Sequence, residues 1–107
     1  VKIKNDEDGI HIGLWLDTEL VSVISLFIEG QEAQFRKFAT LEHLQGRGFG
    51  SALLGHLIDF SKKHKVQLLW CHARTSALPF YQKFGLDAVG DTFIKEGIEY
   101  VKMEIQL

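Results

Sequence analysis

The stretch QGRGFGS at residues 45–51 places three glycines within five positions. The run before it, residues 34–41, mixes apolar and charged residues as an extended segment does. The run after it, residues 51–63, has its apolar residues at the spacing of one helical face: Leu53, Leu54, Leu57 and Ile58. The stretch therefore predicts a tight junction between a strand and a helix, and so a β-α unit.

Glycines at such a junction let the backbone approach a ligand closely and turn its N–H groups toward it. The positive end of the helix dipole lies directly behind, which favours an anion such as a phosphate. A Walker loop is excluded, because no Lys followed by Ser or Thr comes after the last glycine. The dinucleotide fingerprint G-x-G-x-x-G also fails, since its last position would be Ser51 or Leu53. A flexible junction without a ligand is the alternative.

The stretch resembles the Q/R-x-x-G-x-G/A signature of the GCN5-related N-acetyltransferases (the GNAT family), with Gln45, Gly48 and Gly50 at the signature positions. In that family the loop holds the pyrophosphate of acetyl-coenzyme A. Residues 73–86, ARTSALPFYQKFGL, resemble the family's later motif, F/L-Y-x-x-x-G-F/L, at Phe80, Tyr81, Gly85 and Leu86. The closing stretch from Phe93 is also similar to that of a subgroup of these acetyltransferases. The resemblance covers roughly residues 10–107.

The residues of the second motif independently predict a short helix. Its apolar residues follow an i, i+3, i+4, i+7 stripe: Ala77, Phe80, Tyr81 and Phe84. Gly85 suits the position just after a helix, and Thr75 or Ser76 can cap its start.

The composition is that of one globular domain covering residues 1–107, with 46% hydrophobic and 24% charged residues. A net charge of −2 gives no basic footprint, so nucleic acid is not expected as a partner. The apolar runs are short, so no membrane span or membrane partner is expected. The single cysteine, Cys71, and the lack of a leader-like start predict a cytoplasmic protein.

Strands are predicted at Ile10–Leu16, Leu20–Ile28, Gln34–Leu41, Val66–Cys71, from Ala88 onward, and at Tyr100–Leu107. Their order around the two helices, ββ(β-α-β)αββ, predicts an α/β fold. The sheet is expected to be mixed, mostly antiparallel and twisted, with one parallel β-α-β unit and flanking helices, as the family resemblance implies.

The beginning of the chain departs from the family pattern, which normally has a strand and two helices there. Only Val1 to Gly9 precedes the first predicted hairpin, so the family's N-terminal helices are expected to be absent. The acceptor pocket is then open, or covered by a second subunit of a homodimer, or residues are missing from this sequence. The acidic run at residues 6–8 is expected to be a solvated terminus.

The resemblance implies which residues bind the coenzyme. Backbone groups of Phe38, Ala39 and Thr40 would pair with the pantetheine arm and the acetyl carbonyl. The loop N–H groups would hold the pyrophosphate, from Gln45, Gly46, Arg47, Gly48, Phe49, Gly50 and Ser51. Arg74 stands where many relatives have an asparagine that hydrogen-bonds the cofactor arm.

Tyr81 occupies the position where the family often places a tyrosine that protonates the coenzyme A sulfur. A phenol is a suitable acid for a departing thiolate. The alternative role for Tyr81 is that of a tyrosine packed in the core. His72, at the end of the central strand, is the candidate general base, against a structural histidine. Cys71 is expected to face the opposite side and pack as a small apolar residue. The histidines show no metal spacing, so no metal is expected.

The predicted function is transfer of an acetyl group from acetyl-coenzyme A to a primary amine, on a small molecule or a peptide, by direct attack in a ternary complex. Trp15 and Phe93 are the aromatic residues expected to border the acceptor. The alternative is a catalytically degenerate module that binds acetyl-coenzyme A or acts as a regulator.

Overall fold

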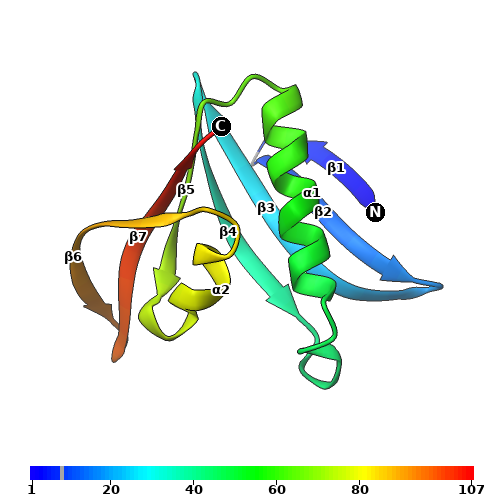
Figure 1. Cartoon of the computed structure of the whole chain (residues 1–107). Coiled ribbons are helices and arrows are strands. Elements are labelled where there is room, and N and C mark those ends of the chain that lie inside the picture. Colours follow the sequence, from blue (N-terminus) through cyan, green and yellow to red (C-terminus); the bar gives the residue numbers. More distant parts are fainter. Residues whose placement is uncertain (8) are drawn as a thin grey trace.

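A seven-stranded sheet with its helices on one face forms the fold in the computed structural model, which describes residues 1–7 and 9–107 (Figure 1). Asp8, part of the predicted acidic terminus, lies outside the described residues. The strands are β1 (Lys2–Asp6), β2 (Gly9–Leu16), β3 (Glu19–Glu29), β4 (Glu32–Thr40), β5 (Leu68–Arg74), β6 (Asp87–Lys95) and β7 (Ile98–Gln106). The helices are α1 (Phe49–Lys63) and α2 (Leu78–Gln82), with 3₁₀ turns η1 (Glu42–Leu44) and η2 (Thr75–Ala77).

The strands follow the order β1-β2-β3-β4-β5-β7-β6 across the sheet. Each described neighbouring pair is antiparallel except β4 and β5, which run parallel and are joined through α1. A parallel pair needs such a crossover, because its two strands start at the same edge of the sheet. The predicted α/β fold with one parallel β-α-β unit is confirmed.

The core lies between the sheet and the two helices. The predicted apolar face of α1 is buried there, and Leu53, Leu54 and Leu57 have no exposed surface. They pack against the inward-facing residues of the sheet, which include Ile12, Ile24, Leu26, Phe35, Leu69, Val101 and Met103. Full burial of a Leu or Ile side chain contributes about 1.5–3 kcal/mol, so this layer holds the helices on their face of the sheet.

Several boundaries differ from the sequence prediction. α1 begins at Phe49, two residues before the predicted start, because Gly48 turns the chain with φ +86° just ahead of it. The central strand covers Leu68–Arg74 and not Val66–Cys71, because the turn that ends α1 extends to Val66, whose N–H donates to Ser61 O at 3.0 Å.

The predicted caps on the short helix were wrong. Neither Thr75 nor Ser76 makes a capping hydrogen bond, because a 3₁₀ turn precedes α2. Thr75 Oγ1 instead donates to Glu99 Oε1 at 2.9 Å. Gly85 was expected just after the helix, and its φ of +92° lies in the left-handed region that favours glycine.

The first strand, β1, was not predicted. All five of its residues are exposed, so it carries no apolar alternation that sequence analysis can detect. It pairs with β2 along its whole length, and the first hairpin of the fold is therefore β1–β2.

Candidate active site

The sheet opens between its two parallel strands. β4 and β5 pair through only three residues each, and their ladder ends at Gln34 and Trp70. Beyond that point β4 contains a bulge, where Ser25 pairs with Arg36 but Val23 pairs with Ala39. Lys37, inside the bulge, has φ +56°. A bulge bends its strand, so the two strands diverge and leave a cleft of about 920 Å³ between them.

Most of the predicted site residues meet in this cleft. Those that line it are Phe38, Ala39, Thr40, Gln45, Gly46, Gly48, Gly50, Ser51, His72, Arg74 and Tyr81. Arg47 and Phe49 belong to the same loop but are not among the lining residues. The end of β4 with the loop after it, the end of β5, and α2 thus converge on one cavity.

The glycine loop presents bare backbone at the start of α1. Gly46 and Gly48 have φ values of +80° and +86°, and a Cβ added at either would have no atom within 4 Å. In the part of the chain that the structure describes, no side chain caps the first turn of α1, and that turn contains no acidic residue. The first N–H groups of a helix lack partners within it and carry a partial positive charge. The loop can therefore receive an anion.

Side chains fix the loop against the end of β4. Gln45 Nε2 donates to Thr40 O at 3.1 Å. Ser22 Oγ, on β3, donates to Ala39 O at 3.1 Å and lies 2.9 Å from Thr40 Oγ1. A Cβ on Gly50 would lie 3.5 Å from Phe38 Cζ, so the first turn of α1 packs directly on this strand end. Gln45 thus positions the loop through its side chain.

Tyr81 lies in an aromatic group at the wall of the cleft. Its ring centroid is 6.0 Å from that of Phe35, 6.5 Å from Phe38 and 5.2 Å from Phe80. Burial, with a smaller contribution from Cys71, raises the pKa of the Tyr81 phenol above its usual value near 10. The phenol is therefore neutral at pH 7 and has a proton to donate. Tyr81 packs against the core and also lines the cleft.

Cys71 and His72 line the cleft from opposite faces of β5. Cys71 is 2% exposed, and burial raises the pKa of its thiol to about 12. His72 is exposed on the face without helices. Partial loss of hydration, then the charges of Lys102, Arg36 and Lys95, lower the pKa of His72 below 6.5. Cys71 packs as a small apolar residue, as predicted, and its thiol is protonated at pH 7. His72 is neutral at pH 7.

Sequence reasoning missed further lining residues: Arg36, Lys37, Phe80, Lys83 and Tyr100. Phe80 was predicted as part of the helical stripe and of the family motif, but not as a residue that lines the site. The alternation of β4 and β7 can place Arg36 and Tyr100 on one face, but only the strand register brings that face to His72. Of the two aromatic residues expected at the acceptor, Phe93 has its ring centroid 5.0 Å from that of His72. Trp15 is not among the lining residues and lies under Lys2 Nζ, at 4.6 Å.

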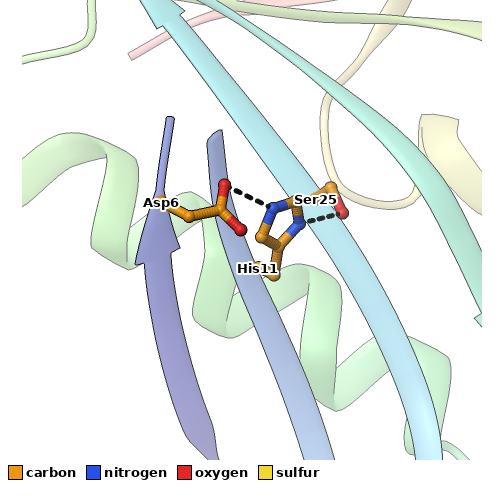
Figure 2. Close-up of polar contacts among 3 residues, drawn as sticks. All are labelled: Asp6, His11 and Ser25. Carbon is orange, nitrogen blue, oxygen red and sulfur yellow. Dashed lines mark hydrogen bonds and ion pairs between the residues drawn. The ribbon is translucent and has the colours of Figure 1, made fainter. Parts of the chain in front are cut away.

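A second polar group lies on β1, β2 and β3, away from the cleft. Figure 2 shows His11 between Asp6 and Ser25: Nδ1 lies 2.8 Å from Ser25 Oγ, and Nε2 lies 3.2 Å from Asp6 Oδ1. The residue types are those of a nucleophilic triad, but Ser25 is 6% exposed, so its hydroxyl cannot reach a substrate. The group ties three strands together, and Asp6 is more than a solvated residue.

Within the described residues, no group of three or more His, Cys, Asp or Glu is arranged to hold a metal ion. No described helix is both long and apolar enough to cross a membrane.

Comparison with known proteins adds to this geometry. The chain is similar to the [ribosomal protein bS18]-alanine N-acetyltransferase of Haemophilus influenzae, with 33% identity over 91 residues, 81% of this chain and 62% of that protein. The chain spans 63% and 62% of the length of the curated relatives that it matches.

Solved structures share the fold. The ribosomal-protein-S18-alanine N-acetyltransferase of Escherichia coli superposes with a TM-score of 0.84 at 22% identity, over 94% of this chain and 70% of that one. A Bacillus subtilis acetyltransferase in complex with coenzyme A gives 0.79 at 24% identity, over 94% and 78%. The sequence profile of a family described as "Acetyltransferase (GNAT) domain" matches residues 2–107. The chain therefore belongs to the GNAT family of acetyltransferases.

Proposed function

We propose that residues 1–107 form one acetyltransferase domain that moves an acetyl group from acetyl-coenzyme A to a primary amine. The observation that carries this proposal is the uncapped, open glycine loop at the start of α1, which adjoins a cleft lined by Tyr81 and His72. Family membership supports the same reaction.

The pyrophosphate would lie on the N–H groups of residues 45–51, where the helix dipole favours negative charge. The pantetheine arm would run along residues 38–40 of β4. Beyond Gln34 this edge of β4 has no ladder partner on β5, so its backbone groups are available to pair with the amides of the arm. Acetyl-coenzyme A supplies an activated acyl group as a thioester. The arm would direct that group between β4 and β5, toward Tyr81.

The acceptor nitrogen would attack the thioester carbonyl carbon, so that the C–N bond forms as the C–S bond breaks. The Tyr81 hydroxyl gives its proton to the departing sulfur. His72, which is neutral at pH 7, takes the proton that the attacking amine loses. The products are the N-acetyl amine and the free thiol of coenzyme A, and Tyr81 regains its proton from solvent.

Direct attack is favoured over an acetyl-enzyme intermediate. Cys71 is the single cysteine of the sequence, and its thiol is both buried and protonated at pH 7. The thiolate is the nucleophilic form of cysteine, so this residue is a poor acyl acceptor. This supports direct attack of the amine on the thioester in one complex with the enzyme.

The test is calorimetric titration with acetyl-coenzyme A of the wild-type chain and of two matched variants. Gly48→Glu places a carboxylate in the loop. Gly30→Glu places one at the turn before β4, at a glycine with the same open surroundings and a φ of +63°. Both variants force a side chain into the left-handed region, so both lose similar stability. Binding should be lost in Gly48→Glu alone.

A turnover screen follows, with thiol release as the readout. It includes small amines and a peptide with N-terminal alanine, because one relative is named as an alanine N-acetyltransferase of ribosomal protein bS18. Binding without turnover of any amine would favour the degenerate coenzyme-binding module. Equal binding by Gly48→Glu and wild type would refute the loop assignment.

A further inference from the structure

The face of the sheet opposite the helices carries an aromatic group around His72. The His72 ring centroid lies 5.2 Å from that of Trp70 and 5.0 Å from that of Phe93. Phe93 stacks on Tyr100 at 5.8 Å, with 19° between the ring planes. Register explains the grouping, since His72 pairs with Lys102, and Tyr100 pairs with both Arg74 and Phe93. Of these rings, His72 and Tyr100 line the cleft, and Trp70 and Phe93 lie beside His72.

Cations from three strands surround the same group. Arg36 comes from β4, Lys102 from β7 and Lys95 from β6, and all three contribute to the positive potential at His72. Lys102 Nζ lies 4.8 Å over the Trp70 ring. Arg36 donates to Gln34 Oε1 at 2.9 and 2.7 Å through Nε and Nη2 and lies over Phe27.

Carboxylates do not neutralise these cations. In residues 1–7 and 9–107, none forms an ion pair with Arg36, Lys95 or Lys102, and the cleft lining contains no Asp or Glu. On β7, Glu99 accepts from Thr75, whereas Glu104 lies on the same face as Lys102, next to Trp70. Glu29 and Glu32 line a second hollow together with Arg36 and Trp70. Within the described residues, none of these carboxylates forms an ion pair with the three cations.

These cations are separate from the proposed phosphate site. The glycine loop and Tyr81 lie on the helix side of the sheet, whereas Arg36, Lys102 and His72 alternate to the other face. A simple alkylamine arrives as an ammonium ion, and a positive surface repels it. The surface attracts an amine that brings its own negative charge.

We infer that the acceptor is an amine that also carries a carboxylate, with an apolar body that packs on Trp70, Phe93 and Tyr100. This inference rests on the proposed acetyl transfer. The carboxylate pairs with Lys102 and Arg36, and the amine then lies beside His72 at the mouth of the cleft. The bond changes are those of the proposed transfer, and the carboxylate takes no part in them. Lys102 and Arg36 are therefore specificity residues.

Three acceptors with one ring system test this: phenylalanine, phenylalaninamide and phenethylamine. Phenylalaninamide has the less basic amine, so more of it is already neutral at pH 7, and a preference for phenylalanine would run against basicity. We expect kcat/KM for phenylalanine to exceed that of the other two by about tenfold. In Lys102→Glu the preference should reverse, mainly through KM, while acetyl-coenzyme A affinity is unchanged. Lys102→Gln should give an intermediate result.

Lys4→Glu is the matched control. It makes the same charge reversal on β1, on the same face but four strands from β5, roughly 19 Å away at the usual strand spacing. It should leave the preference unchanged. Faster turnover of phenethylamine or phenylalaninamide by the wild-type chain would overturn the inference and leave the acetyl transfer standing.

A binding measurement separates failure of this inference from failure of the proposed acetyl transfer. N-acetylphenylalanine and its neutral amide are titrated while the tryptophan fluorescence is followed, because Trp70 lies under Lys102. Tighter binding of the acid, lost in Lys102→Glu, would support the inference even if no amine turned over and the proposed function failed. Equal or weaker binding of the acid would overturn it.

Discussion

Cys71 and His72 are adjacent on β5, and their side chains lie on opposite faces of the sheet. Cys71 points toward the helices and is 2% exposed, whereas His72 is exposed among Trp70, Phe93 and Lys102. The strand thus separates a dry side of the cleft, with Tyr81, from a solvated and positively charged side. In the proposed mechanism, Tyr81 as proton donor and His72 as proton acceptor would approach the thioester from these two sides.

The Cys71 thiol should react slowly with iodoacetamide at pH 7.5 in the folded chain and quickly after denaturation, because burial raises its pKa to about 12. Intact mass spectrometry after mixing with acetyl-coenzyme A, without an amine, should show no added acetyl group. A stable acetyl adduct on Cys71 would instead establish a covalent route.

His72 should titrate below its ordinary pKa of 6.5, since lost hydration and nearby cations both disfavour its charged form. The ring resonance is followed by NMR and assigned by its loss in His72→Gln. Lys102→Gln removes one cation and should move the midpoint upward. The unfolded chain binds this proton more readily, so folding stability falls slightly as the pH drops below about 6.5. A wild-type midpoint at or above 6.5 would contradict this account.

Tyr81→Phe should lower kcat by about 10²-fold or more, the usual contribution of a general acid, with unchanged affinity for acetyl-coenzyme A. Phenylalanine keeps the ring contacts with Phe35, Phe38 and Phe80, so the fold should be retained. Steady-state kinetics and calorimetry separate the two effects. Unchanged kcat would assign the proton to another donor.

The sequence predicted those parts of the site that depend on local signals. The glycine spacing around Gly48 and the helical stripe that contains Tyr81 each carry a pattern that can be read without the rest of the chain. β1 has no such pattern, because its partner β2 supplies the pairing. The position of Arg36 beside His72 depends on a bulge and on register across the sheet, which short-range periodicity does not contain.

Lys37 shows the same limit, and it can be tested. Nothing about a lysine indicates a left-handed backbone, yet Lys37 has φ +56° in the bulge. A non-glycine residue in this region loses roughly 1–2 kcal/mol, and a β-branched one more. Lys37→Gly should therefore be neutral or stabilising, and Lys37→Val should be destabilised by about 1–2 kcal/mol in urea unfolding.

The matched control is Lys95→Val, at an exposed strand position that is not among the left-handed residues. Its effect should be near zero, because valine favours strands. Equal losses from Lys37→Val and Lys95→Val would mean that the bulge conformation imposes no strain.

The short ladder between β4 and β5 has a mechanical consequence. Three residue pairs join these strands, against seven between β5 and β7. The sheet thus has two parts, one of β1 to β4 with α1 and one of β5 to β7 with α2. Few strand-pairing hydrogen bonds join these two parts. A molecule in the cleft contacts both parts and replaces the residue pairs that β4 and β5 do not form beyond Gln34 and Trp70. A bound molecule therefore stabilises the contact between the two parts, and the temperature of unfolding rises with its concentration.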